Sequence, residues 1–185
     1  MPLDATPETR TAYLALGSNL ASAHGAPEET LSAAIDRLRT LGRVTAVSSF
    51  YETDPVGFHR QPVFLNAVLA LETRLDPEEL LSKMLVLEQE FGRRPDASVA
   101  GGPRTLDLDL LIVEDLVIRS EGLELPHPAL AERRFVLAPL AEIAPSLLHP
   151  ILGSTVAELL EELPDAGENR ISAVRKTGIR PVVGS

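Results

Sequence analysis

The chain contains no cysteine and no tryptophan, and aromatic residues make up only 4% of its 185 positions. Without cysteine there can be no disulfide, no thiolate metal site and no thiol nucleophile, and a reducing compartment is compatible with the sequence. No hydrophobic run approaches the roughly 20 residues that a membrane-spanning helix needs. Because the start of the chain also lacks a basic leader and a signal core, we expect a cytoplasmic protein with no membrane partner.

Positive charge is scarce as well, since 17 Lys and Arg against 27 Asp and Glu give a formal net charge of -10. A general nucleic-acid binder normally carries a basic face that neutralises phosphates, so we expect no nucleic-acid partner. The arginines nevertheless gather, with Arg93, Arg94 and Arg104 flanking one loop and Arg133 and Arg134 forming a second pair. A small anionic ligand is compatible with these positions, although surface arginines are most often only solvated.

The common nucleotide and hydrolase motifs are also missing. The sequence has no G-x-x-x-x-G-K-[ST], no G-x-G-x-x-G, no H-E-x-x-H and no G-x-S-x-G. A chain of 185 residues that is 44% hydrophobic fits one globular domain with a single core. We expect residues 1–164 to form that domain, and residues 165–185, which lack periodicity, to be a loose extension.

The spacing of apolar residues predicts alternating strands and helices. The expected strands cover residues 11–17, 44–52, 63–73 and the Asp-bearing segment that follows a loop over 93–103, and a short hairpin is expected over 116–125. The expected helices cover residues 27–41, 76–91, 128–143 and 154–163. The first six elements follow the order β-α-β-β-α-β. This order is typical of an α+β, ferredoxin-like fold, an antiparallel sheet with helices on one face, here followed by extra C-terminal helices.

Residues 103–109, Pro-Arg-Thr-Leu-Asp-Leu-Asp, put two carboxylates on one face of a predicted strand. Side chains alternate along a strand, so Asp107 and Asp109 project together while Leu108 points the other way. Their Cα atoms would be roughly 7 Å apart, a span that one or two hard cations such as Mg²⁺ can bridge while sharing ligands with a substrate phosphate. Arg104 adds a positive charge nearby. An amphipathic strand that shows its acids to solvent is the alternative.

Four further residues depart from ordinary patterns. Phe64 and Asn66 lie on the strand face opposite the regular apolar one, and asparagine is depleted in strands. A planar ligand with donors and acceptors would explain the amide, whereas Phe64 alone fits a core. Glu88 shares a helix face with apolar residues, where a carboxylate needs a donor such as a ribose hydroxyl, unless that edge faces solvent. His127, held between two prolines, could donate to a phosphate oxygen or lie at the surface.

Five motifs in a fixed order are more specific than any of these residues alone. They are Ala-Leu-Gly-Ser-Asn-Leu (15–20), Ser-Ser-Phe-Tyr-Glu-Thr-Asp-Pro-Val-Gly (48–57), Gln-Pro-Val-Phe-Leu-Asn (61–66), Gly-Pro-Arg-Thr-Leu-Asp-Leu-Asp (102–109) and Leu-Pro-His-Pro (125–128). With them the chain resembles the 6-hydroxymethyl-7,8-dihydropterin pyrophosphokinases of folate biosynthesis over about residues 12–163. Members of that family have the ferredoxin-like fold that the periodicity predicts.

The resemblance implies an ATP- and Mg²⁺-dependent enzyme that transfers the terminal pyrophosphate of ATP to the pterin hydroxymethyl group and leaves AMP. Two Mg²⁺ ions would be held by Asp107 and Asp109. In the implied pterin site, two phenylalanines stack on the ring, an amide bonds its edge, and backbone groups complete the pocket. The residues of this site are Thr53, Val56, Phe64, Asn66 and Phe135. The implied ATP contacts are Glu88, Arg93, Arg104, His127 and Arg133. Arg93 and Arg104 would act with the two aspartates in catalysis by stabilising phosphate charge, without a general base.

The loop from 93 to 103 departs from the family pattern. Arg94 follows Arg93 directly, and residues 98–101 lack a tryptophan. Outside the loop, Pro128 replaces an aromatic residue that often follows the histidine in this family. We expect this loop to be mobile in the free protein and ordered with both substrates.

Two alternative functions remain, a non-catalytic ferredoxin-like binding module and another Mg²⁺-dependent nucleotidyl or phosphoryl transferase. We expect a monomer whose partners are the small molecules ATP and 6-hydroxymethyl-7,8-dihydropterin.

Overall fold

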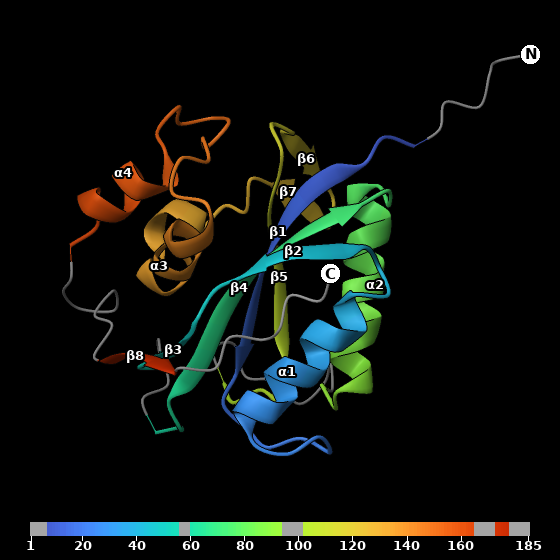
Figure 1. Ribbon diagram of the computed structural model, residues 1–185, viewed down its shortest axis with the longest axis vertical. Helices are drawn as coiled ribbons and strands as arrows, with labels where there is room; N and C mark the ends of the chain where they lie inside the picture. The colour runs from blue at the N-terminus through green and yellow to red at the C-terminus, as the bar shows by residue number, and fades with distance from the viewer. Residues whose placement is uncertain (1–6, 56–59, 94–101, 165–172, 178–185) are drawn as a thin grey trace, which may run out of the picture.

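The computed structural model describes residues 7–55, 60–93, 102–164 and 173–177. At its centre is an antiparallel sheet in the order β5-β1-β4-β3-β8, with β2 also paired to β4 (Figure 1). These strands are β1 (Arg10–Ser18), β2 (Arg43–Val47), β3 (Phe50–Thr53), β4 (Phe64–Thr73), β5 (Asp107–Val113) and β8 (Ala173–Thr177). The α+β class expected from the sequence is confirmed, and so is the hairpin, as β6 (Ile118–Ser120) and β7 (Leu123–Leu125).

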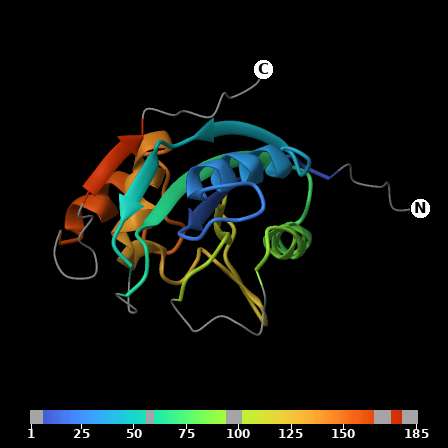
Figure 2. The same cartoon turned by 90° about the horizontal axis from the view of Figure 1, so that it is seen from below.

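Helices lie on both sides of the sheet. The two helices α1 (Pro27–Leu38) and α2 (Pro77–Glu90) cover one face, and α3 (Arg134–Ile143) and α4 (Val156–Glu162) lie against the other (Figures 1 and 2). A short 3-10 turn, η1 (Leu130–Glu132), precedes α3. Within the described ranges, no helix is long and apolar enough to cross a membrane.

The first two helices begin where the sequence predicts. Pro27 occupies the first turn of α1, together with the acidic Glu28 and Glu29 that favour a helix N-terminus. At α2 the side chain of Asp76 accepts the Glu79 N–H at 2.8 Å and so satisfies one of the unpaired donors of the first turn. The structure ends α1 at Leu38, three residues before the predicted end, and the following turn passes directly into β2.

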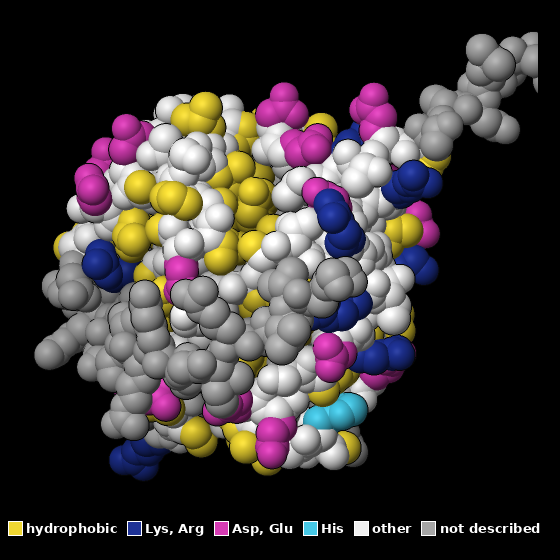
Figure 3. Space-filling view, viewed as in Figure 1, with side chains coloured by type: hydrophobic (Ala, Val, Ile, Leu, Met, Phe, Trp, Pro, Cys, Tyr) yellow, Lys and Arg dark blue, Asp and Glu magenta, His cyan; other side chains and the backbone are white. Residues whose placement is uncertain are grey.

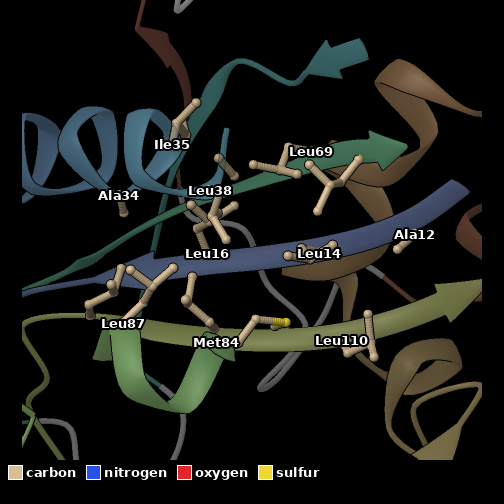
Figure 4. Packing of buried hydrophobic residues seen from close by; sticks show 14 of the residues in the cluster. Ala12, Leu14, Leu16, Ala34, Ile35, Leu38, Leu69, Met84, Leu87 and Leu110 are labelled. Atoms are coloured by element: carbon tan, nitrogen blue, oxygen red, sulfur yellow. The ribbon is translucent and has the colours of Figure 1, made fainter. Parts of the chain in front are cut away.

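The main core lies between the sheet and the first two helices. Leu14 of β1, Leu69 of β4 and Leu110 of β5 point toward α1 and α2, where Ile35 and Met84 meet them (Figure 4). Each of these five side chains is at most 3% exposed. The alternation predicted for residues 63–73 is confirmed from Leu65 onward, because Leu65, Ala67, Leu69 and Leu71 all belong to this cluster. Val63, expected on the same face, precedes β4 and is 51% exposed.

A second, smaller core lies on the opposite face. There Val68 of β4 and Leu111 of β5 pack against Leu137 and Leu140 of α3 and Val156 of α4. Hydrophobic side chains gather over α3 and α4 in the space-filling view (Figure 3). These helices pack on one end of the sheet, and the other end of this face, where β1 ends and β4 and β5 begin, lines a cleft instead.

Three expectations about the elements need correction. The strand expected over 44–52 is broken at Ser48 and Ser49 into β2 and β3, since Ser48 bonds Val68 through both its backbone N–H and its hydroxyl. In place of the helix expected over 128–143, the α-helix α3 begins only at Arg134, after the 3-10 turn η1. Residues 173–177, expected to be part of a loose extension, form β8, because the outer edge of β3 offers an unpaired row of backbone groups.

Candidate active site

The cleft has a volume of about 680 Å³ and opens on the sheet face opposite α1 and α2. Its floor is the end of β1 and the first residues of β4 and β5, and its walls come from the segments that precede β5 and α3. Nine of the predicted site residues line it, namely Thr53, Phe64, Asn66, Arg104, Asp107, Asp109, His127, Arg133 and Phe135. Segments far apart in the sequence therefore meet at one place.

The remaining predicted positions differ in where they fall. Glu88 and Arg93 do not line the cleft but lie behind its carboxylate wall, where Arg93 contacts Asp107. Val56 lies outside the described residues, and so does most of the loop expected to be mobile, residues 94–101.

One end of the cleft carries two rings and an amide. Phe64 begins β4 and Phe135 lies in the first turn of α3, and both line the cleft. The Asn66 Nδ2 donates to Thr53 Oγ1 at 2.5 Å, across the β3–β4 pair in which Thr53 also faces Phe64. The amide of Asn66 is therefore held in one orientation. Two aromatic faces and a fixed amide are suited to a flat heteroaromatic ligand.

Gly17 makes room for this arrangement, and the sequence reasoning did not single it out. It is paired with Asn66 of β4 on one side and with Asp107 of β5 on the other. A Cβ at this position would lie 3.0 Å from Asn66 Oδ1. The absence of a side chain keeps the cleft open between the amide and the carboxylates. The signal that could have revealed it is its place in the 15–20 motif.

Asp107 and Asp109 project from β5 into the cleft, as the alternation predicts, while Leu108 is buried on the other face. The carboxylate Oδ1 of Asp107 accepts from Arg93 at 3.0 Å and from Arg104 at 2.8 Å. Burial raises the pKa of Asp109, and the charge of Asp107 raises it further, although nearby cationic groups oppose both effects. The two acids are therefore not simply solvent-facing, and a positive charge between them would relieve their repulsion.

The opposite wall places a histidine and an arginine beside the carboxylates. His127 Nδ1 accepts the Ala129 N–H at 3.2 Å, which leaves Nε2 to carry the proton of the neutral ring, 3.8 Å from Asp109 Oδ1. Burial lowers the pKa of His127, against the raising effect of the Asp109 charge. The guanidinium of Arg133 lies 5.7 Å from the centre of the Phe135 ring. These groups offer donors to an anion in the cleft.

Glu88 is the most deeply buried acid of the site, with 2% exposure, so the solvent-facing alternative is wrong. Its Oε1 accepts the backbone N–H of Leu108 at 2.7 Å and contacts Arg93 Nη1 at 2.5 Å. Burial raises its pKa, while the Leu108 N–H and Arg93 lower it. Glu88 thus bonds the strand residue between the two aspartates and the arginine that contacts one of them.

Asn19 is a second residue that sequence reasoning missed. Its Nδ2 donates to Gln61 Oε1 at 2.9 Å and to the Pro62 carbonyl at 3.0 Å, and its Oδ1 accepts the Arg104 N–H at 2.8 Å. One side chain therefore joins the segments that follow β1, precede β4 and precede β5. Its presence in the 15–20 motif is the sequence signal of this role, and in the fold its side chain is buried, with 3% exposure. Asp54 and Glu132 also line the cleft without having been predicted.

Comparison with known proteins gives a consistent result. The model of the family described as 7,8-dihydro-6-hydroxymethylpterin-pyrophosphokinase (HPPK) matches residues 13–145. The 2-amino-4-hydroxy-6-hydroxymethyldihydropteridine pyrophosphokinase of Pseudomonas aeruginosa is 43% identical over 161 residues, which cover 86% of this chain and 95% of that protein. The protein of the same name from Bacillus subtilis is 48% identical over 134 residues, covering 71% of this chain and 77% of the relative.

Some relatives are much longer. The folic acid synthesis protein fol1 of Schizosaccharomyces pombe is 41% identical over 162 residues, but the chain spans only 21% of its length. A solved structure of Plasmodium falciparum HPPK-DHPS with pterin and p-hydroxybenzoate superposes with a TM-score of 0.69 at 17% identity, covering 86% of this chain and 45% of that one. At that identity the likeness concerns the fold.

Proposed function

The chain belongs to the 7,8-dihydro-6-hydroxymethylpterin-pyrophosphokinase family, and we propose that it transfers the terminal pyrophosphate of ATP to 6-hydroxymethyl-7,8-dihydropterin in folate biosynthesis. The products are AMP and the pterin diphosphate. One observation carries the assignment to this cleft: a pocket of two rings and an amide adjoins a pair of carboxylates flanked by arginines. Such a cleft suits a flat acceptor next to a triphosphate.

The pterin end of the cleft is assigned to Thr53, Phe64, Asn66 and Phe135. The two phenylalanines hold the ring from its faces, and each stacked aromatic pair contributes about 0.5 to 1.5 kcal/mol beyond the burial of area. The Asn66 amide, fixed by Thr53, supplies hydrogen-bonding groups to the ring edge. Val56, outside the described residues, is assigned to the same pocket from the family resemblance. This end of the cleft therefore orients the hydroxymethyl group.

The carboxylate pair fits Mg²⁺, on which this family depends. Within the described residues, no group of three or more His, Cys, Asp or Glu side chains could hold a metal ion by itself. Asp107 and Asp109 would thus supply few ligands, and triphosphate oxygens and water the rest, which is the usual coordination of Mg²⁺ at nucleotide sites. Two bound ions would neutralise phosphate charge and hold the triphosphate in line for displacement.

The cationic and donor groups around the cleft are assigned to the triphosphate. Arg104 and Arg133 each add a permanent positive charge beside the aspartates, and the His127 Nε2–H donates to a phosphate oxygen. Arg93 belongs to the same set through its contact with Asp107. Glu88 was expected to contact ATP directly, but its bonds to Leu108 and Arg93 favour a supporting role, in which it positions the strand and the arginine.

The chemical step needs positioning more than proton transfer. The pterin hydroxymethyl oxygen attacks the β-phosphorus and loses its proton to water, the bond from that phosphorus to the α,β-bridging oxygen breaks, and AMP leaves with the bridging oxygen. Arg93 and Arg104 stabilise the charge that develops on the phosphate oxygens. The residues of the cleft contribute by holding the two substrates in the geometry of attack, which is where most of the rate enhancement of such transfers arises.

The nucleotide product tests this proposal. Incubation with ATP, Mg²⁺ and 6-hydroxymethyl-7,8-dihydropterin should give AMP and the pterin diphosphate in equal amounts, and neither without the pterin. ADP as the main product would contradict the pyrophosphokinase assignment and favour an ordinary phosphoryl transferase. If folded protein with Mg²⁺ turned over no nucleotide, a binding module would be favoured. We propose in addition that residues 1–164 and the strand β8, which completes their sheet, form one domain, and that the protein acts as a cytoplasmic monomer.

A further inference from the structure

We propose that Glu142 is a positioning residue for the pterin pocket, because it fixes α3 on the sheet at the spacing that lets Phe135 face Phe64 across one flat ring. This inference rests on the proposed function, which makes the flat ligand a pterin. Glu142 does not line the cleft. It lies seven positions after Phe135, about two turns along the same helix face.

Among the residues that the structure describes, Ser49 and Tyr51 join Glu142 to the sheet through three hydrogen bonds. Its Oε1 accepts the Ser49 N–H at 3.0 Å and the Ser49 hydroxyl at 2.7 Å, and its Oε2 accepts the Tyr51 hydroxyl. We call these three residues the Glu142 cluster. Ser49 and Tyr51 are each 4% exposed. Burial, followed by the contact with Glu142, raises the pKa of Tyr51, so its hydroxyl stays a neutral donor.

The interruption between β2 and β3 provides the backbone donor. Ser48 exchanges backbone and side-chain hydrogen bonds with Val68 of β4, at 2.8 and 2.9 Å. The next residue, Ser49, turns its N–H to Glu142 instead of to a neighbouring strand. A regular strand would have used this N–H in the ladder or left it at an edge. The irregular pair of serines thus directs a donor at α3.

This polar contact supplies what the apolar packing under α3 cannot. The helix lies on valine and leucine side chains, whose attraction is not directional. Arg134 Nη1 donates to the carbonyls of Leu160 and Leu163 at 3.3 and 3.1 Å and so joins the start of α3 to the end of α4. These bonds join the two helices to each other and fix neither of them to the sheet. The hydrogen bonds of Glu142, which have defined angles, fix where α3 lies on the sheet.

The Glu142 cluster adjoins the pterin end of the cleft and lies away from the carboxylates. Tyr51 is paired with Asn66, and Thr53, two residues further along β3, is paired with Phe64. In contrast, Asp107 and Asp109 lie on β5, separated from β3 by β1 and β4. A shift of α3 therefore changes the spacing of the two rings more than it changes the phosphate end.

The test compares binding of the two substrates in the full chain. We expect Glu142→Ala to raise the pterin Kd about tenfold or more, since stacking depends on ring spacing. The Kd of an Mg²⁺-loaded ATP analogue that resists cleavage should change by less than about threefold, because Arg104 and the two aspartates lie before or on β5, away from α3, and only Arg133 adjoins that helix. Glu142→Gln should restore most of the pterin affinity, because its amide can bond both Ser49 and Tyr51. Tyr51→Phe, which removes one bond and keeps the ring, should act in the same direction as Glu142→Ala and more weakly.

A matched control separates loss of stability from loss of position. Glu158→Ala makes the same chemical change on α4, where Glu158 Oε2 accepts the Thr155 N–H at 2.7 Å and helps to cap the helix. This variant should leave both Kd values unchanged. Incorporation of 4-fluorophenylalanine allows the Phe135 ring to be followed by ¹⁹F NMR without any ligand. Its signal should shift or broaden in Glu142→Ala and remain as in the wild type in Glu158→Ala.

The outcomes distinguish the two proposals. An unchanged pterin Kd and an unchanged Phe135 signal in folded Glu142→Ala would overturn the positioning role, as would an equal loss of pterin and nucleotide affinity. If Glu142→Ala does not fold, the same readings on Tyr51→Phe decide. A wild-type protein that binds no pterin contradicts the proposed function, while the Phe135 signal still reports whether Glu142 fixes α3.

Discussion

The two faces of the central sheet use the same strands in different ways. Toward α1 and α2, the strands β1, β4 and β5 present leucines such as Leu14, Leu69 and Leu108, all at most 5% exposed. On the opposite face, at the end that α3 and α4 leave open, the same strands present Gly17, Asn66 and Asp107, which line the cleft.

The difference follows from the two-residue period of a strand, which sends alternate side chains to opposite faces. Polar and charged groups at the cleft can therefore sit one residue away from a leucine of the core. Because the apolar face stabilises the sheet that carries the polar one, substitutions on the two faces should have separable effects. Those on the apolar face should lower stability, and those in the cleft should lower binding or turnover.

The largest effect should come from the carboxylates of the cleft. Asp107→Ala and Asp109→Ala should each lower turnover about a thousandfold, roughly 4 kcal/mol in activation free energy, because one carboxylate cannot hold Mg²⁺ against the triphosphate. Both side chains lie off the apolar core, so the urea midpoint of each variant should stay near that of the wild type. AMP formation and urea unfolding measure the two quantities. More than about a tenth of wild-type turnover in either variant would contradict the metal assignment.

Leu108→Ala tests the other face of the same strand. The side chain is 5% exposed in the main core, so its truncation should lower the free energy of unfolding by about 3 kcal/mol, within the range of roughly 2 to 5 for buried leucines. The Leu108 N–H that Glu88 accepts belongs to the backbone and remains. Well below its midpoint of thermal unfolding, this variant should bind Mg²⁺ and ATP as the wild type does. A loss of nucleotide affinity equal to that of the aspartate variants would show that the faces are not separable.

The aromatic end of the cleft should give the next effect. Phe64→Ala and Phe135→Ala together should weaken pterin binding more than tenfold, over about 1.4 kcal/mol, and leave the affinity for Mg–ATP nearly unchanged. The physical reason is that stacking acts on the flat ring alone. Titration calorimetry with each ligand separately measures both affinities. An equal loss for pterin and nucleotide in folded protein would point to general damage of the cleft.

Much of this comparison was accessible from the sequence because it depends on short-range periodicity. The alternation of residues 63–73 predicted which side chains of β4 enter the core, and the same rule placed Asp107 and Asp109 together. The apolar spacing likewise predicted α1 and α2 to within a few residues. In each case the deciding interactions lie within one turn or one strand, so the local pattern carries the information.

What the sequence did not reveal depends on partners far along the chain. Glu88 was recognised as an unusual acid, but its acceptance of the Leu108 N–H joins residues 20 positions apart. The break at Ser49 depends on Glu142, 93 positions away. The pairing of β8 with β3 likewise depends on the free edge of β3, which the sequence pattern of residues 165–185 does not reveal. Tertiary contacts of this kind override a local strand or loop preference.

The smallest effect should come from Gly17→Ala, which puts a methyl group into the cleft without changing charge. Glycine within a strand is less stable than alanine by about 0.5 to 1 kcal/mol, so the variant should unfold at the same urea concentration or slightly higher. The new Cβ would lie 3.0 Å from Asn66 Oδ1, so the amide held by Thr53 must shift by a few tenths of an ångström. We expect the pterin Kd to rise about threefold, with Mg–ATP affinity unchanged. Stability and pterin affinity would then change in opposite directions in this one variant, a result that is not expected of a residue needed only for folding. A fall in both quantities would instead place Gly17 among the structural residues of the sheet.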